Sequence, residues 1–429
     1  MTTILLMFLI MFVLLLLGVP LVYSIGTAAV IILVGQGHTN ITLLPARMFK
    51  GVDSFVLAAI PFFLLAAEIL TRGGLVKKLI DFCSLLIGHF RGGLAQVNIL
   101  VSILFAGIQA SVTADSAAIG GLLIPAMIEE KYDKDFSVVV TATSSCIGPI
   151  IPPSILMILY AFLTNTSVAK LFLGGAIPGI VLGIGLMGIT HYWVLKRGYQ
   201  RKRQKIGSLQ EICKQGTATM PALIVPAIII VGLVGGIATP TEAGVLACVA
   251  SVLLAGLIYR ELSFKKLIAS LKSTAHTTTV IWAVIAVSTV FSEVLVRNSF
   301  APRIITAISS VTSNPTGVLF LITIVVFILG MAIDTTPLLI MLAGPLYDVG
   351  NAVGIDPIHL GVVLVMTALI GTISPPVSLI LCLDCGIAKI PLRDTFGIVW
   401  SYLLIMLAVV LLCVLIPGLV TWLPNMFIK

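Results

Sequence analysis

The sequence has little charge and no long polar stretch. Only 10% of its 429 residues are Asp, Glu, Lys or Arg, whereas 59% are hydrophobic. The mean hydropathy of +1.19 is far above that of globular domains. Apolar runs of membrane-spanning length recur along the chain, and no polar segment is long enough to form a separate soluble domain. These properties exclude a soluble protein and predict an all-α polytopic membrane protein.

The sequence also lacks the patterns of disulfide-rich proteins, metal sites and enzymes. Its seven cysteines are scattered, mostly in apolar runs, so we expect no disulfide framework. Cys382-Leu-Asp-Cys385 is a single CxxC without a second pair or a neighbouring histidine, which argues against redox or metal use. Nucleophile elbows, zinc-binding His-Glu motifs and phosphate-binding loops are missing. We therefore expect no enzyme, no cofactor and no ATP-driven pump.

Basic residues carry the net charge of +8, and they lie in loops between apolar runs. This distribution indicates membrane topology and contact with anionic lipids rather than nucleic-acid binding. The N-terminus has no basic segment and no small-residue cleavage site, and its apolar run extends to about Val34, which is too long for a signal peptide. We expect residues 4–34 to be a retained first span.

The distribution of Lys and Arg predicts the orientation. Two apolar stretches, about 93–127 and 314–347, are interrupted by Gly, Ser, Thr and Asp, and we expect each to enter and leave the membrane on one side. With this arrangement 19 basic residues lie on one side and 6 on the other. The first side is therefore cytoplasmic, with the N-terminus inside and the C-terminus outside. Full spans are expected at about 4–34, 55–71, 137–163, 167–195, 219–237, 241–260, 274–296, 358–384 and 396–423.

Three motifs of the first half recur in the second half, two of them shifted by 223 positions and one by 225. The predicted topology turns the two interrupted stretches to opposite sides of the membrane, so the repeats are inverted. Inverted repeats with broken apolar segments are typical of secondary transporters. The motif pairs are Glu68 to Arg72 with Glu293 to Arg297, Gly107 to Ser111 with Gly330 to Asp334, and Gly148 to Pro153 with Gly371 to Pro376.

Paired prolines break the apolar segment that follows each interrupted stretch, at Pro152-Pro153 and Pro375-Pro376. A proline lacks the N–H donor and disfavours helix in the preceding residue, so carbonyls one turn earlier lose their partners. Such free groups persist in a bilayer only inside protein or beside an aqueous cavity. One break is commonly a structural kink. Two breaks in matching positions favour a site for a small cation, lined by carbonyls and by Ser, Thr and Gly.

Each interrupted stretch contains a carboxylate, Asp115 in the first and Asp334 in the second. A charged Asp at mid-membrane costs about 2.5–3.5 kcal/mol, so it needs a partner or water. Asp334 aligns with Ser111, which places side-chain oxygens at equivalent positions. Asp115 has no aligned acid, and helix capping and ion binding are equal alternatives for it.

Two Glu-Arg pairs have i,i+4 spacing, Glu68 with Arg72 and Glu293 with Arg297, and each pair can form along one helix face. Structural ion pairs at the membrane interface are the favoured interpretation, and gating or substrate contact is the alternative. The amphipathic segment that follows each pair is expected to lie at the interface.

Three motifs together resemble the large membrane subunit of TRAP (tripartite ATP-independent periplasmic) transporters: Gly148-Pro-Ile-Ile-Pro-Pro-Ser154, Gly236-Ile-Ala-Thr-Pro-Thr-Glu-Ala-Gly244 and Ile373-Ser-Pro-Pro-Val377. The resemblance covers essentially the whole chain, and the three motifs in this order are specific. It implies an elevator-type transporter of the ion-transporter superfamily, with two re-entrant helical hairpins and two broken helices moving past a scaffold. It also implies sodium-driven uptake of a small organic acid, of the sialic acid or C4-dicarboxylate class, across the bacterial inner membrane.

The resemblance implies partners and a site as well. The family works with a small four-helix membrane subunit, expected here as a separate chain, and with a soluble periplasmic substrate-binding protein. The commoner family pattern has Gly after Pro-Pro-Val and then Asn, whereas this chain continues with Ser378, so no ligand beyond Val377 is assigned. The sodium ligands carried over are Gly107, Ser111, Gly148, Gly330, Asp334, Thr335, Gly371 and Ser374, and the candidates for substrate contact are Ser116, Ser154 and Thr336.

The expected organisation alternates scaffold and transport segments. A channel or passive pore for organic anions is the alternative, although a channel would not need two half-sites on inverted repeats. An intramembrane hydrolase would need a nucleophile with its base or a paired aspartate motif, and the sequence has neither. The segments are 1–54, 55–91, 164–260 (with a cytoplasmic arm at 196–217) and 261–313 for the scaffold, 92–163 and 314–394 for the transport domain, and 395–429 for a C-terminal span.

Overall fold

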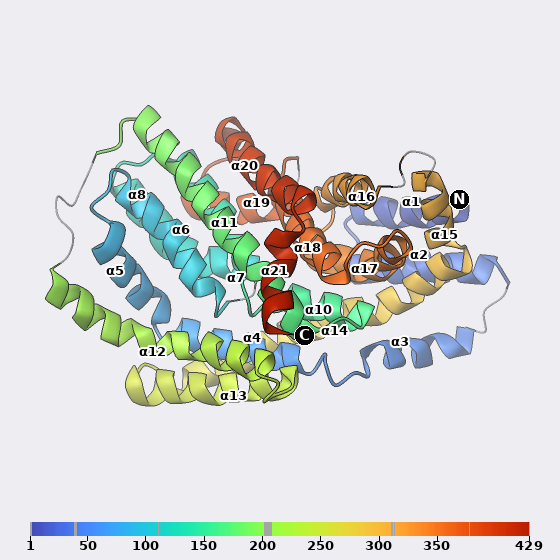
Figure 1. Ribbon diagram of the computed structural model, residues 1–429, viewed down its shortest axis with the longest axis horizontal. Coiled ribbons are helices and arrows are strands. Elements are labelled where there is room, and N and C mark those ends of the chain that lie inside the picture. Colours follow the sequence, from blue (N-terminus) through green and yellow to red (C-terminus); the bar gives the residue numbers. More distant parts are fainter. Residues whose placement is uncertain are drawn as a thin grey trace.

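The structure is a computed structural model, and it describes residues 2–37, 41–109, 111–200, 208–309, 312, 314–376 and 378–428. Over these residues every regular element is a helix, and no strand occurs (Figure 1). Within these described ranges, six helices are long and apolar enough to cross a membrane, or seven if a bent pair counts as one span. The predicted all-helical, multi-pass architecture is therefore confirmed for the described part of the chain.

The helices of the first half are α1 (Thr2–Leu16), α2 (Leu21–Gly35), α3 (Leu44–Val52), α4 (Ala59–Arg72), α5 (Leu75–Ile87), α6 (Gly93–Ala106), α7 (Val112–Asp115), α8 (Gly121–Glu129), α9 (Lys134–Ser145), α10 (Ile155–Thr164) and α11 (Val168–Lys196). A π-helical turn, Ser116–Gly120, joins α7 to α8. Those of the second half are α12 (Leu209–Val234), α13 (Pro240–Leu253), α14 (Phe264–Arg297), α15 (Phe300–Ser309), α16 (Pro315–Gly330), α17 (Thr335–Ala352), α18 (Pro357–Ile373), α19 (Leu379–Ala388), α20 (Phe396–Leu415) and α21 (Gly418–Phe427).

The order of elements after α4 is the same as the order after α14. In the first half α4 bends by 67° into the short α5, and a helix pair (α6 with α7 and α8), an interrupted helix (α9 and α10) and the long α11 follow. In the second half α14 is followed by the short α15, the pair α16 and α17, the interrupted helix α18 and α19, and α20. The repeated motifs thus occupy corresponding elements of the two halves.

Both interrupted helices break at their paired prolines, as the sequence predicts. The first stops at Ser145 and restarts at Ile155, and the second stops at Ile373 and restarts at Leu379. The bonds between the two prolines are cis in both breaks. Ser154 caps α10 after the first break, because its hydroxyl accepts a hydrogen bond from the backbone N–H of Met157 at 3.3 Å.

Two of the expected spans are each two helices instead. The apolar run at 4–34 divides into α1 and α2, because Gly18 adopts a φ of +82° and Pro20 caps the second helix. The run at 396–423 divides at Ile416 and Pro417, where α20 ends and α21 begins. A proline has no N–H to donate to the helical hydrogen-bond ladder, and hydropathy alone does not detect this interruption. The prediction of one continuous span for each run was therefore wrong.

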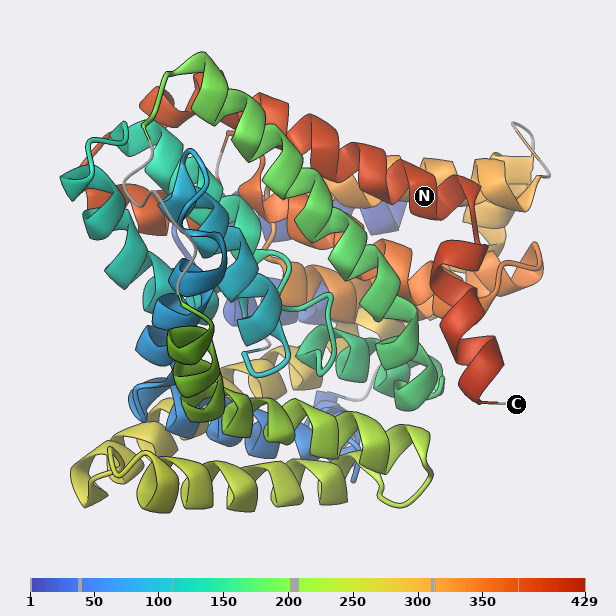
Figure 2. The same ribbon diagram turned by 60° about the vertical axis from the view of Figure 1, so that its left-hand side comes forward.

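The helices pack in two groups. One group contains α1 to α4 with α13 and α14, and α12 lies against α13 and α5. The other contains α6, α9, α18, α20 and α21 around α11, with α16 and α17 packed on α18. Figure 2 shows α12 and α13 (yellow-green and yellow) together along one side of the molecule, and α11 (green) crossing the other group. The groups meet where α17 packs on α14 and where α5 packs on α6.

The helix α11 lies within residues 164–260, which the sequence analysis assigned to the scaffold. The helix packs on α6, α18, α20 and α21, which include elements expected in the transport domain. Glycines allow this close approach: a Cβ added at Gly183 would lie 2.6 Å from Ile103 Cδ1 of α6, and one at Gly174 would lie 3.1 Å from Ile358 Cγ2 of α18. The C-terminal α20 and α21 join the same group.

The Glu-Arg pairs expected from their spacing are present. Arg72 Nε lies 2.8 Å from Glu68 Oε2, and Arg297 Nη2 lies 2.6 Å from Glu293 Oε1. Each glutamate also bonds to a second helix, since Ser273 of α14 donates to Glu68 at 2.8 Å and Arg47 of α3 pairs with Glu293. These contacts fasten α14 to its neighbours, which fits the structural interpretation of the pairs.

A third ion cluster closes the end of α11. Arg197 donates to Asp133 at 2.7 Å and to Asp135 at 2.8 Å, and Tyr199 donates to Asp133 at 2.7 Å. Partial burial opposes ionisation of Asp135, but the hydrogen bonds from Arg197 outweigh it and hold the pKa of Asp135 below its ordinary value. The cluster ties α11 to the start of α9. The rest of the expected cytoplasmic arm includes residues 201–207, which lie outside the described residues.

Candidate functional site

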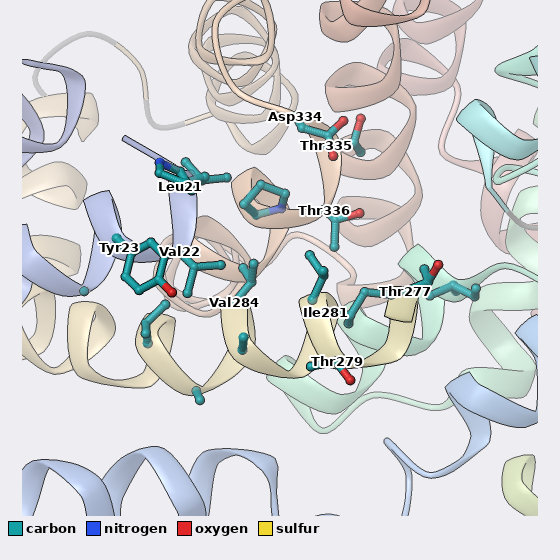
Figure 3. Close-up of a pocket in the computed structure, with 18 of the residues that line it drawn as sticks. Leu21, Val22, Tyr23, Thr277, Thr279, Ile281, Val284, Asp334, Thr335 and Thr336 are labelled. Carbon is teal, nitrogen blue, oxygen red and sulfur yellow. The ribbon is translucent and has the colours of Figure 1, made fainter. Parts of the chain in front are cut away.

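A cavity of about 1140 Å³ lies where the two groups of helices meet. Residues of α2 and α14 line one side, and the first residues of α7, α10 and α17 line the other. Figure 3 shows Asp334, Thr335 and Thr336 at the start of α17, opposite the side chains that α14 contributes. The cavity therefore lies between segments of both sequence repeats (α7, α10 and α17) on one side and α2 and α14 on the other.

Side-chain oxygens gather at the two helix starts. Ser111 caps α7, accepting from the N–H of Ala114 at 3.5 Å, and its hydroxyl lies 3.1 Å from that of Thr113. Asp334 occupies the capping position of α17 but makes no side-chain capping bond. The Thr335 hydroxyl donates to the carbonyl of Ala368 at 3.5 Å. Four predicted site residues, Ser111, Asp334, Thr335 and Thr336, thus line the same cavity.

The opposite wall comes from residues that the sequence analysis did not single out. Tyr23 of α2 contributes to it, as do His276, Thr277 and Thr279 of α14, with apolar side chains such as Ile281 and Val284 beside them (Figure 3). Consecutive polar residues inside an otherwise apolar span could have indicated this wall from the sequence, because such residues are costly in lipid and usually face protein or water.

The cavity lining contains no Lys or Arg in the described part of the chain. Its charged or titratable members are Asp334, His276 and Tyr23. Positive potential comes instead from helix N-termini, since residues 112–129 form a continuous helical stretch starting at the cavity and α17 starts there as well. A helix N-terminus carries about half a positive charge, which favours anions nearby.

The four predicted glycines lie behind these helix starts and do not line the cavity. A Cβ on Gly371 would lie 2.7 Å from Gly330 Cα, so α18 and α16 touch backbone to backbone. Gly148 approaches the carbonyl of Gln109 in the same way, with 3.1 Å to its hypothetical Cβ. Gly107 faces Pro226 of α12. In both halves, the helix pair therefore contacts the interrupted helix that follows it.

Three further predicted serines turn away from the cavity. Ser374 donates to the carbonyl of Ile370 at 2.9 Å, and Ser154 donates to the carbonyl of Pro149. Ser116 donates to Asp384 Oδ1 at 2.7 Å. Of the three candidates for substrate contact, Thr336 alone lines the cavity, whereas the hydroxyls of Ser116 and Ser154 bind protein groups.

The capping interpretation of Asp115 is wrong. Ser111 is the cap of α7, and Asp115 lies one turn further on with a fully buried side chain. The reason is that α7 starts at Val112, so the capping position falls on Ser111 and not on Asp115.

Val377, after which no ligand was assigned, lies outside the described residues.

Comparison with known proteins decides the family. A family model described as the tripartite ATP-independent periplasmic transporter, DctM component, matches residues 8–419. The chain belongs to this TRAP transporter family. The resemblance found in its three motifs is thereby confirmed. Membership implies a periplasmic binding protein and a small membrane subunit as partners.

Curated relatives of this TRAP subunit are large permeases and not enzymes. The sialic acid TRAP transporter large permease of Vibrio cholerae is 33% identical over 416 residues, which are 96% of each chain. The C4-dicarboxylate TRAP transporter large permease of Pseudomonas aeruginosa is 32% identical over 402 residues, which are 94% of each chain. The near-complete coverage shows that the TRAP chain aligns with a whole large permease.

A solved structure shares the fold at much lower identity. The YdaH transporter of Alcanivorax borkumensis superposes with a TM-score of 0.65 and 12% identity, covering 88% of each chain. This likeness places the TRAP chain in a membrane transporter fold and carries no information on its substrate.

Proposed function

We propose that this large TRAP permease couples sodium entry to the import of a small organic acid by an elevator mechanism. The observation that carries the proposal is the convergence of Ser111 and Thr113 from one repeat, and Asp334 to Thr336 from the other, on one cavity. A site shared by two repeats at the boundary of two helix groups is what alternating access requires.

The surroundings of Asp334 support a sodium site. Its carboxylate has no cationic side chain paired with it within the described ranges, and Thr335 and backbone carbonyls of α18 lie nearby. Hard oxygen ligands suit a small cation, and a bound cation offsets the cost of a carboxylate at depth. Ser111, Gly107 and Gly148 are proposed to form the equivalent half-site.

The lining supports a small organic acid of the sialic acid or C4-dicarboxylate class. Without Lys or Arg in the described lining, the negative charge of such an acid would be balanced by bound sodium and by the N-termini of α17 and the stretch 112–129. The hydroxyls of Thr277 and Thr336 offer hydrogen bonds to a polyol or a second carboxylate. The substrates of the relatives named above, sialic acid and C4-dicarboxylates, fit this description.

The packing suggests which parts move. In the proposed elevator, α6 to α11 and α16 to α21 form the transport unit, and α1 to α5 with α12 to α15 form the scaffold. This division moves α11, α20 and α21 from their expected places, because their contacts lie with the transport helices. The two helix pairs act as re-entrant hairpins of opposite orientation.

The proposed orientation predicts opposite accessibility for two loops. Cys213, an exposed native cysteine near the start of α12, should lie in the cytoplasm, and Ile237, which is 78% exposed in the turn after α12, should lie in the periplasm. Intact spheroplasts carrying Cys382→Ser should resist a membrane-impermeant thiol reagent until they are lysed, whereas addition of Ile237→Cys should give labelling before lysis. Labelling of both positions before lysis would contradict the orientation.

Uptake by the reconstituted complex tests the function itself. Proteoliposomes containing the chain with its small subunit should accumulate a labelled acid only when the binding protein and an inward sodium gradient are both supplied. Omission of either should reduce uptake to background, and counterflow should persist without the gradient because a carrier exchanges bound substrate. Rapid equilibration of the acid without the binding protein or sodium would favour the channel alternative and sink the proposal.

A further inference from the structure

Two carboxylates lie buried together away from the cavity. Asp115 of α7 and Asp384 of α19 both have 0% exposed side chains, and neither lines the cavity. Ser116, the residue next to Asp115, donates to Asp384 Oδ1 at 2.7 Å. This bond joins the first helix pair to the second interrupted helix, across 268 positions of sequence.

Each carboxylate has one oxygen without a hydrogen-bond partner. Asp115 Oδ2 accepts from the Ser102 hydroxyl at 3.3 Å, while Asp115 Oδ1 and Asp384 Oδ2 are buried and bind no group in the described part of the chain. No Lys, Arg or His among the described residues forms an ion pair with either one. Two ionised carboxylates at this depth would be uncompensated, and buried charges are normally paired or neutralised.

The hydrogen-bond chain beyond Asp115 is short of a donor. The Ser102 hydroxyl has one hydrogen, yet it lies within bonding distance of both Asp115 Oδ2 and Ser144 Oγ, at 3.3 and 3.2 Å. Ser144 in turn lies within bonding distance of Asn98 Oδ1, at 3.2 Å, and of the Thr141 carbonyl, at 3.0 Å. If Asp115 carries a proton and donates it to Ser102, the hydrogen of Ser102 is available to Ser144. The contacts of Ser102 with both Asp115 and Ser144 are then satisfied, and Ser144 keeps its own hydrogen for Asn98 or Thr141.

We propose that Asp115 and Asp384 form a proton-binding site inside the transport unit, distinct from the cavity and from the sodium ligands proposed around Asp334. A proton needs no coordination volume, which matters because Gly120 packs against the pair, with a hypothetical Cβ only 2.9 Å from Asp384 Oδ1. Among the residues that the structure describes, no group of three or more His, Cys, Asp or Glu gathers to hold a metal ion. The proposal stands whether or not transport is coupled to sodium.

Few other titratable groups face the pair. The helix α6 has none, and α8 has only Glu129 at its exposed far end. On α9 the charged residues Lys134 and Asp135 lie at the opposite end from the pair. The nearby thiols of Cys146 and Cys385 ordinarily stay neutral at pH 7. The remaining groups on packed elements are the exposed Lys389, Arg393 and Asp394 after α19, exposed Cys382 on α19, and His359 at the start of α18.

Infrared spectroscopy of the purified chain tests the proposal. A protonated carboxyl absorbs at a carbonyl-stretching frequency separate from that of carboxylates, and the band shifts in heavy water. The wild-type protein at neutral pH should show such a band, and Asp384→Asn or Asp115→Asn should each reduce or remove it. Asp348→Asn, which changes an exposed carboxylate on α17, is the matched control and should leave the band unchanged. Ser116→Ala, which retains both acids, should shift its frequency.

Linkage gives a second readout. A proton held by the folded protein and released on unfolding at neutral pH makes stability fall as pH rises. The fall in melting temperature between neutral and alkaline pH should therefore be smaller in Asp384→Asn than in the wild type and in Asp348→Asn. A wild-type spectrum without the protonated band would overturn the proposal. So would a melting temperature that sodium raises in Asp348→Asn but not in Asp384→Asn, because the pair would then hold sodium.

Discussion

Replacing Asp334 with asparagine is expected to lower sodium affinity at least about tenfold, which corresponds to about 1.4 kcal/mol, and to reduce sodium-driven uptake to background. Asparagine keeps the shape and one oxygen of the side chain but removes the negative charge. Asp334 lines the cavity at the start of α17, makes no capping bond, and has no cationic partner in the described part of the chain. The charge is thus free to bind a cation, and folding should survive its loss.

Sodium-dependent thermal shift and isotope uptake measure this effect. The matched control is Asp348→Asn, which removes an exposed carboxylate further along the same helix and should preserve both quantities. Ser111→Ala tests the equivalent position of the first repeat and should weaken sodium binding less, because a neutral hydroxyl is the poorer ligand. Wild-type sodium affinity and uptake in both Asp334→Asn and Ser111→Ala would mean that the helix starts are structural and that the site lies elsewhere.

Local rules were sufficient to predict the breaks in the helices. The interruptions at Pro152-Pro153 and Pro375-Pro376 follow from the missing N–H donor and from the restricted residue before each proline, which act within a few residues. The same rule applied to Pro20 and Pro417 would have divided the first and last apolar runs correctly. Hydropathy over a long window hid these two signals, because it averages a single proline with many apolar neighbours.

The cavity wall and the buried acid pair depend on tertiary packing and were not predictable in this way. Asp384 appears in the sequence as the third residue of a CxxC, and nothing local indicates that Ser116 bonds to it. His276 and the threonines after it could be recognised as unusual in a span, but their position opposite Asp334 follows from how α14 packs on α17.

The contact between α16 and α18 predicts a graded response to added methyl groups. A Cβ on Gly371 would lie 2.7 Å from Gly330 Cα and 2.8 Å from its carbonyl carbon, so it would meet backbone that cannot turn aside. A Cβ on Gly330 would be slightly less crowded, at 3.1 Å from Gly371 Cα and 3.2 Å from the carbonyl of Ala368. Overpacking of this kind costs about 1–3 kcal/mol.

Gly371→Ala should therefore reduce both melting temperature and uptake most strongly, and Gly330→Ala should do so less. The control is Gly344→Ala on α17, where nothing lies within 4 Å of the added atom, and alanine there should preserve or slightly raise the melting temperature because it favours helix. Folded Gly371→Ala protein, identified by a monodisperse elution profile, should also bind sodium more weakly, since separating the two helices moves Asp334 and Thr335 away from the carbonyls of α18. Equal melting temperatures and equal sodium binding in all three variants would show that the backbones of α16 and α18 do not touch. The proposed arrangement of sodium ligands around Asp334, which depends on that contact, would then be wrong.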